Sequence, residues 1–164
     1  MTRRKKPNPP DTKYFHYYNN NPKDRHVGDC AYRALALFLD VSWEEAARIA
    51  WDCYLETGCL IEESNINRIH SPGYMFTFNK MNIEYYLEDK FGCVCLPKEE
   101  CKKQDEEGFT RATTIQEFID LFAEEGETYL VSASKHFTVV KDKKVWDIVD
   151  CSEIHGSRYY IRKK

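Results

Sequence analysis

Residues 28–39 read Gly-Asp-Cys-Ala-Tyr-Arg-Ala-Leu-Ala-Leu-Phe-Leu, and this stretch decides the fold. From Cys30 to Leu39 the side chains are apolar or aromatic, with Arg33 as the exception. A helix that is apolar on nearly every side is a buried helix, so the pattern predicts a helix in the centre of the domain. Asp29 is a residue type favoured just before a first helical turn, and we expect it to be the N-cap.

Three further helices are predicted from start signals followed by apolar residues at helical spacing. Ser42 and Glu45 form a capping box, in which each side chain can bond the backbone N–H of the other residue. Thr114 and Glu117 repeat this pattern. The expected helices run from Ser42 to just before Gly58, from about 79 to 90, and from Thr114 to Gly126.

Strand-forming residues dominate the two ends of the chain. An aromatic run at 14–18 stops at Asn19-Asn20-Asn21-Pro22, a cluster of turn formers. The predicted strands are 14–18, 93–96, 128–133, 136–141, 144–149 and 157–162, with Asp142-Lys143 as a tight turn. Helices followed by an antiparallel meander predict the α+β class.

Two kinds of segment lie outside these elements. Residues 1–12 are proline-rich and basic without periodicity, which predicts a disordered lead-in before a single domain at 13–164. The stretch 59–76 has no clean period and predicts a loop, and the charged stretch 98–108 predicts an exposed loop.

The composition is that of one globular domain: 164 residues, 42% hydrophobic, 31% charged and a net charge of −3. A chain of this length buries roughly 70% of its unfolded surface, so its stability does not depend on disulfides or a structural metal. Lys and Arg number 24 against 27 Asp and Glu. This balance disfavours nucleic-acid binding through the overall field and leaves only a local basic patch at residues 3–6.

The sequence also predicts a cellular location. The basic start runs into Pro7-Asn8-Pro9-Pro10 instead of an apolar stretch, so no export signal is expected. The longest apolar run, 34–39, is far below the roughly 20 residues that span a bilayer. Seven cysteines, an odd number at irregular spacing, indicate reduced thiols. We therefore expect a cytoplasmic protein without membrane contact, and no pattern predicts its oligomeric state.

Cys30 is the first candidate for chemistry. A cysteine in the first turn of a buried helix lies near unpaired backbone N–H groups and the positive end of the helix dipole, which favour the thiolate. The same N–H groups can stabilise a negative oxygen on a substrate carbonyl. A thiol nucleophile needs a base, and His136, at the head of a predicted strand, is the candidate.

The hairpin predicts a third member of the group. With Asp142-Lys143 as a two-residue turn, Thr138 faces Asp147, and His136 and Asp147 share one face of the sheet. A carboxylate there can orient the imidazole and stabilise its cation. Asp150 is the alternative, because a shift of one residue in register would bring it opposite His136.

Two segments resemble the papain-like cysteine peptidase superfamily. They are Gly28-Asp29-Cys30-Ala31-Tyr32-Arg33-Ala34-Leu35 and, about a hundred residues later, His136-Phe137-Thr138-Val139-Val140 with Val145-Trp146-Asp147. More narrowly, the aromatic strand, Asn21-Pro22-Lys23 and the Gly-Asp-Cys helix are similar to short proteins common in bacteriophage genomes. The helix motif also looks like that of otubain-type deubiquitinating peptidases, and the His-Phe strand looks like that of bacteriocin-processing peptidases.

The resemblance covers roughly 14–162 and implies a fold and a reaction. The fold would be papain-like, with a central cysteine-bearing helix packed on a C-terminal antiparallel sheet. The reaction would be thiol-dependent hydrolysis of an amide, isopeptide or thioester bond in a protein or peptide, without a cofactor. If the chain is phage-encoded, it would act in the host cytoplasm.

The chain departs from these families around the oxyanion hole. Papain-type peptidases carry a glutamine six residues before the cysteine, where this chain has Asp24, and otubain-type enzymes carry an aspartate where it has Val27. Asn21 and Asn20 are the remaining side-chain donors of suitable chemistry. The alternative hypothesis is therefore an inactive papain-like binding module, such as a phage-encoded inhibitor of a host protein.

Cys93, Cys95 and Cys101 allow a metal-site interpretation, with Cys59 or His70 as a fourth ligand. The Cys-x-Cys spacing differs from the common zinc motifs, and alternate residues of a strand are as easily core thiols. We therefore expect no metal site.

Overall fold

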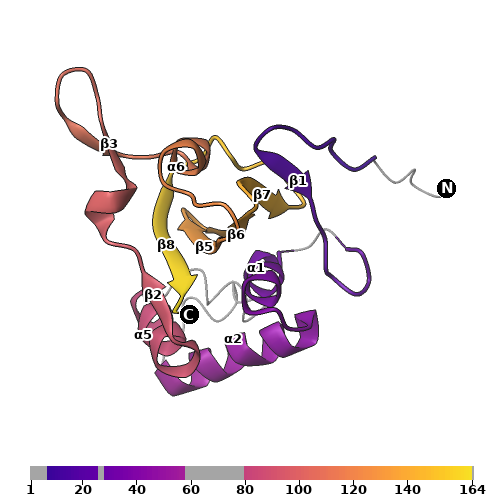
Figure 1. The fold of residues 1–164 in the computed structure, drawn as a ribbon. Coiled ribbons are helices and arrows are strands. Elements are labelled where there is room, and N and C mark those ends of the chain that lie inside the picture. Colours follow the sequence, from indigo (N-terminus) through magenta and orange to yellow (C-terminus); the bar gives the residue numbers. More distant parts are fainter. Residues whose placement is uncertain (1–6, 26–27, 58–79, 164) are drawn as a thin grey trace, which may run out of the picture.

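The computed structural model describes residues 7–25, 28–57 and 80–163 (Figure 1). Helices from the N-terminal half pack against a mainly antiparallel six-stranded sheet, most of which comes from the C-terminal half. The α+β class predicted from the sequence is therefore confirmed. The predicted loop at 59–76 and residues 1–6 of the predicted lead-in lie outside the described residues.

The sheet has the strand order β1-β7-β6-β5-β8-β2. Its strands are β1 (Phe15–Tyr17), β2 (Cys93–Cys95), β5 (Thr128–Ala133), β6 (His136–Lys141), β7 (Lys144–Asp147) and β8 (Gly156–Arg162). Neighbours pair antiparallel, except that β1 runs parallel to β7. The first strand of the chain therefore lies beside a strand that follows it by more than a hundred residues.

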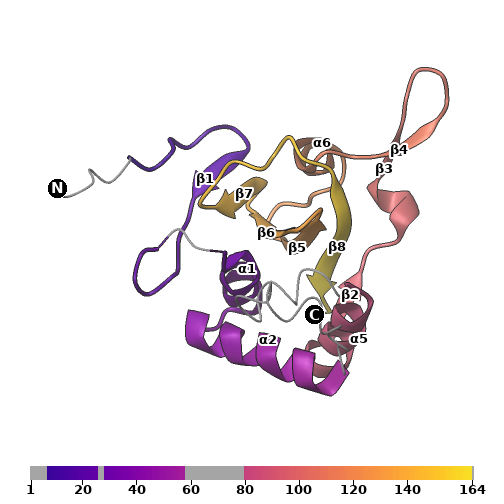
Figure 2. The same cartoon turned by 180° about the vertical axis from the view of Figure 1, so that it is seen from behind.

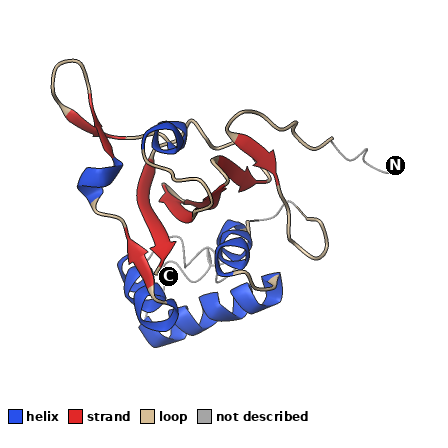
Figure 3. Cartoon of the chain, viewed as in Figure 1, coloured by secondary structure: helices blue, strands red, loops and turns tan. Residues whose placement is uncertain are grey.

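Helices cover both faces of the sheet (Figures 1, 2 and 3). The helices on one side are α1 (Cys30–Leu39), α2 (Trp43–Thr57) and α5 (Lys80–Phe91), and α6 (Ile115–Leu121) lies on the other side. Eight of the ten residues of α1 are buried, as its apolar pattern predicts. Leu35 of α1 joins Leu130 and Val139 of the sheet in one core cluster. Phe118 of α6 joins Val140 and Tyr159 in a second.

The hairpin turn and the second capping box are confirmed, whereas of the predicted Ser42–Glu45 box the structure shows the bond from the Glu45 N–H to the Ser42 hydroxyl at 3.1 Å. Asp142 and Lys143 both adopt positive φ angles, of 50° and 56°, as a two-residue hairpin turn of the primed type requires. Thr114 and Glu117 form the full capping box. The helix that begins there ends at Leu121, five residues before the predicted stop at Gly126, because the N–H groups of Phe122 and Ala123 both donate to the Phe118 carbonyl.

Two other sequence predictions are wrong. Strand β7 ends at Asp147 rather than at residue 149, because the Asp147 side chain itself accepts the N–H of Ile148. Most of the charged stretch 98–108 is exposed as predicted, but Cys101 is buried and the stretch is not a plain loop. It contains a 3-10 helix and one strand of the β3–β4 hairpin, which projects from the domain (Figure 1). These elements are η1 (Lys98–Cys101), β3 (Lys102–Gln104) and β4 (Thr110–Ala112).

The end of the predicted lead-in contacts the sheet. Residues 7–12 form no helix or strand. The carboxylate of Asp11 nevertheless accepts the backbone N–H of Tyr17 at 3.0 Å and lies 2.7 Å from Nδ1 of His16. Contacts with β1 therefore begin at Asp11, close to the expected boundary after residue 12.

None of the helices in the described part of the chain is both long and apolar enough to span a membrane.

Candidate active site

Cys30 is the first residue of α1, and its side chain is partly buried. The thiol interacts with the ring of His136 and with the backbone N–H of Phe137, both on β6. Burial alone would raise the pKa of this thiol, but these two neighbours outweigh burial and hold the pKa below its usual value. The fold thus brings the first turn of α1 to the start of β6.

His136 is the link between the thiol and a carboxylate. Its Nε2 atom lies 2.8 Å from Oδ2 of Asp147, which leaves Nδ1 as the ring nitrogen that can serve Cys30. Burial alone would lower the pKa of the imidazole, but the contacts with Asp147 and the neighbouring thiols raise it well above its usual value. A low thiol pKa beside a high imidazole pKa favours the thiolate–imidazolium ion pair.

The hairpin register decides which aspartate meets His136. Lys141 lies opposite Lys144 and Val139 opposite Trp146, as predicted from the two-residue turn. This register places Asp147 on the face of the hairpin that carries His136. Asp150, the alternative, is exposed, and its carboxylate accepts the backbone N–H of Ser152 at 3.0 Å.

Arg33 is a member of this group that the sequence analysis did not select. Its guanidinium is buried between two carboxylates, paired with Asp29 one helical turn earlier and lying 3.5 Å from Oδ1 of Asp147. The hydrogen bond and charge of His136, with the charge of Arg33 as a smaller contribution, hold the pKa of Asp147 below its usual value against the opposing effect of burial. A single charged residue in an otherwise apolar helix was the sequence signal for this role.

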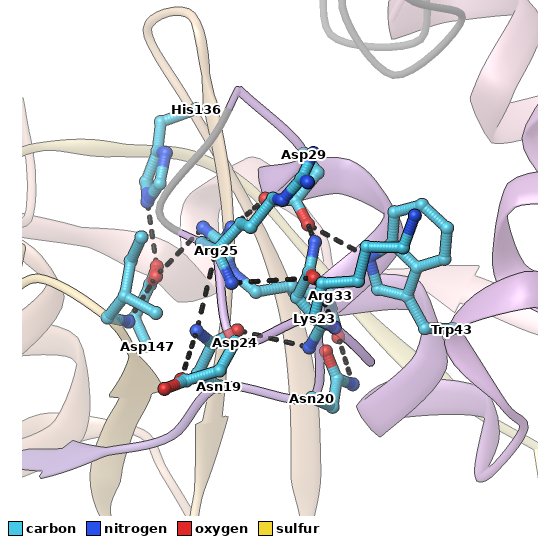
Figure 4. A network of polar contacts seen from close by, with 12 residues as sticks. Asn19, Asn20, Lys23, Asp24, Arg25, Asp29, Arg33, Trp43, His136 and Asp147 are labelled. Atoms are coloured by element: carbon cyan, nitrogen blue, oxygen red, sulfur yellow. Dashed lines mark hydrogen bonds and ion pairs between the residues drawn. The ribbon is translucent and has the colours of Figure 1, made fainter.

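Asp29 precedes the helix as predicted, but its side chain does not cap α1. The buried carboxylate is instead bound by Arg33, by Nδ2 of Asn21 at 2.8 Å and by Nε1 of Trp43 at 2.9 Å (Figure 4). These three donors outcompete the backbone N–H groups of the first turn, which stay free of a side-chain cap. The same arrangement joins the loop before α1 to the start of α2.

The two asparagines considered as oxyanion donors both lie in this network. One N–H of the Asn21 amide is directed to Asp29, and its oxygen accepts the N–H of Lys23 at 2.9 Å. Asn20 donates to the Arg33 carbonyl at 3.2 Å. Asp24, at the place where papain-type enzymes carry glutamine, is exposed and accepts from Asn19 at 3.2 Å. The backbone N–H groups at the start of α1 are the remaining candidate donors for an oxyanion.

Cys151 is the second residue that the sequence analysis missed. Its thiol is buried and lies 4.0 Å from Oδ2 of Asp147, next to the His136 ring. The sequence held no signal for it, because Cys151 follows β7 in a segment without periodicity.

The cysteines considered for a metal site lie elsewhere. Cys93 is buried in the core, and burial raises the pKa of its thiol to about 11. Within the described ranges, Cys93, Cys95 and Cys101 do not converge as a set of metal ligands. Cys59 and His70, the proposed fourth ligands, fall outside these ranges.

Comparison of the chain with protein-family models, curated proteins and solved structures found no match. What the site can do therefore follows from the geometry of its own residues.

Proposed function

We propose that the protein is a papain-like thiol hydrolase with Cys30 as nucleophile, His136 as general base and Asp147 as the residue that orients the base. One observation carries the proposal: His136 interacts with both the Cys30 thiol and the Asp147 carboxylate, although the thiol precedes the other two by more than a hundred residues. The arrangement follows the general pattern of an activated nucleophile, a base and a group that orients the base.

The charges at the site support this reaction. The Cys30 thiolate attacks the carbonyl carbon of an amide, isopeptide or thioester bond, and the helix-start N–H groups stabilise the oxyanion. Imidazolium His136 then gives its proton to the leaving amine or thiol, which leaves an acyl-enzyme. Neutral His136 next takes a proton from water, the resulting hydroxide attacks the acyl group, and the thiolate–imidazolium pair returns. Asp147 stabilises the imidazolium in both stages.

The substrate class is inferred from the resemblance to papain-like cysteine peptidases. A protein or peptide is the expected substrate, and a host protein is the expected target if the chain is phage-encoded. No step of the reaction calls for a cofactor.

The test combines hydrolysis with thiol labelling. Cys30→Ala is expected to abolish turnover while thermal unfolding stays cooperative, and a cysteine-directed electrophile should label Cys30 ahead of the other thiols. Cys101→Ala is the matched control, since Cys101 is a buried thiol of the second core cluster. Labelling of Cys30 no faster than that of Cys93 or Cys101 would contradict the proposal.

A binding module is the second candidate, and the exposed carboxylate of Asp24 at the glutamine position favours it. A carboxylate there would repel an oxyanion. This alternative predicts that Cys30→Ala keeps the full biological effect of the protein, whereas the hydrolase predicts that the effect is lost.

A further inference from the structure

Three different ligand atoms converge on one side of the Asp147 carboxylate. Oδ2 of Asp147 lies 2.8 Å from Nε2 of His136 and 4.0 Å from Sγ of Cys151. All three atoms lie within 4.8 Å of one another. The side chains of His136 and Asp147 are 20% and 4% exposed, and Cys151 is 7% exposed, so the cluster is largely shielded from water.

The opposite side of the same carboxylate is already bound. Oδ1 of Asp147 accepts the N–H of Ile148 at 2.7 Å and lies 3.5 Å from Arg33. These contacts fix the plane of the carboxylate and aim Oδ2 at the other two ligand atoms. Outer contacts of this kind orient the ligands of metal sites.

Imidazole nitrogen, carboxylate oxygen and thiolate sulfur each bind Zn²⁺, and three protein ligands can leave the fourth position of a zinc site open. Metal–ligand bonds of about 2.0–2.3 Å in a tetrahedron place the ligand atoms roughly 3.3–3.8 Å apart. The separation of Oδ2 from Nε2 would therefore increase by about half an ångström. Sγ of Cys151 would approach Oδ2 by about half an ångström and the imidazole nitrogen by up to about 1.3 Å.

We propose that His136 Nε2, Asp147 Oδ2 and Cys151 Sγ form a site for Zn²⁺ or another thiophilic divalent cation, and that the bound cation inhibits the hydrolase. The inhibitory part rests on the proposed function, whereas the binding part does not. Zn²⁺ displaces the proton of Nε2 and the thiol proton of Cys151, and both protons pass to solvent. Because a dication replaces two protons, the total charge of the buried cluster is unchanged.

Inhibition follows from what the cation does to His136. A dication on Nε2 opposes a further positive charge on the same ring, so Nδ1 accepts a proton less readily. It also separates the ring from Asp147, which otherwise stabilises the imidazolium. His136 then no longer serves as the base for Cys30.

Binding is tested with Co²⁺, whose bond to a thiolate gives a near-ultraviolet charge-transfer band. Cys30→Ala serves as the parent, because it removes the other thiol beside His136. We expect this parent to show the band, and the added change Cys151→Ser to abolish it. The affinity for Co²⁺ should fall by more than the roughly 10- to 100-fold that is lost when a residue hydrogen-bonded to a metal ligand is removed. Adding Cys101→Ser instead, as the matched control, should leave both the band and the affinity unchanged.

Two outcomes would contradict the proposed set of metal ligands. A band that disappears in Cys30→Ala would mean that Cys30 is the sulfur ligand. A band that survives Cys151→Ser would mean that Co²⁺ binds elsewhere.

Inhibition is tested with Zn²⁺ in chains that retain Cys30, each variant being compared with its own metal-free activity. The Zn²⁺ concentration for half-inhibition should rise at least tenfold in Cys151→Ser and stay unchanged in Cys101→Ser. Equal inhibition of the native chain and Cys151→Ser would overturn the proposal while leaving the hydrolase intact. Co²⁺ binding as predicted in a chain without hydrolytic activity would support the site and contradict the proposed function.

Discussion

The Nη2 atom of Arg33 lies 3.5 Å from Oδ1 of Asp147, and both side chains are more than nine-tenths buried. This contact joins α1, the helix that begins at Cys30, to β7, the strand that ends at Asp147. Since Arg33 is also paired with Asp29, one guanidinium contacts two buried carboxylates. Arg33 therefore holds α1 and β7 together across the site.

Arg33→Met should reduce the free energy of unfolding by about 3–5 kcal/mol, because it leaves the buried Asp29 carboxylate without a cation and removes one of the two cations beside Asp147. Urea denaturation measures the loss. Arg33→Lys keeps the charge but not the fork geometry, so it should recover part of the stability. Arg48→Met is the control: Arg48 pairs with Glu45 on the exposed face of α2, and its loss should change the midpoint little. Equal midpoints for Arg33→Met and Arg48→Met would contradict the role of Arg33.

Asp147→Asn should lower kcat by up to about 10⁴-fold, because an amide no longer stabilises the imidazolium or selects its tautomer. Asp150→Asn is the matched control, since Asp150 is exposed and an asparagine oxygen can still accept the N–H of Ser152. The comparison uses steady-state hydrolysis of one peptide or thioester substrate. A larger effect from Asp150→Asn would show that in solution the hairpin has the shifted register, in which Asp150 instead of Asp147 lies beside His136.

The pH dependence of thiol alkylation reports on Cys30 directly. The pKa of the Cys30 thiol is lowered, so its thiolate forms as pH rises through a value below the roughly 8.5 of a free cysteine. Cys93, with a pKa raised to about 11, becomes reactive only under alkaline conditions. We expect iodoacetamide to modify Cys30 rapidly near neutral pH while Cys93 stays unmodified, as measured by peptide mass spectrometry.

The matched variant for alkylation is His136→Ala. Without the imidazolium, burial dominates and the pKa of Cys30 should rise, so the alkylation profile should move to higher pH. An unchanged profile in His136→Ala would show that the ring does not lower the thiol pKa.

Local sequence signals predicted the parts of the fold that depend on neighbouring residues. The apolar run from Cys30 identified the buried helix, and Asp142-Lys143 set the hairpin register that places Asp147 beside His136. The parallel pairing of β1 with β7 has no local signal, because it joins segments more than a hundred residues apart. Cys151 reaches the site for the same reason. The lone charge of Arg33 in an apolar helix is a local signal, but its two carboxylate partners are set by tertiary packing.

Gly156 allows the effect of such long-range packing on stability to be measured. A Cβ atom at this position would overlap the hydroxyl and ring of Tyr159. That ring cannot readily retreat, because it is stacked on Phe118 of α6 with the ring centroids 3.7 Å apart. Gly156→Ala should therefore destabilise the protein by about 1–3 kcal/mol, the usual cost of overpacking a core.

The control for this substitution is Gly28→Ala, since a Cβ atom at Gly28 has nothing within 4 Å. Its urea midpoint should stay close to that of the native chain, while the midpoint of Gly156→Ala falls. Because β8 and α6 meet through Tyr159 and Phe118, near-ultraviolet circular dichroism of the aromatic stack should change in Gly156→Ala alone. Equal midpoints for the two variants would mean that the second core cluster has room for a methyl group. That result would contradict the close packing of β8 against α6.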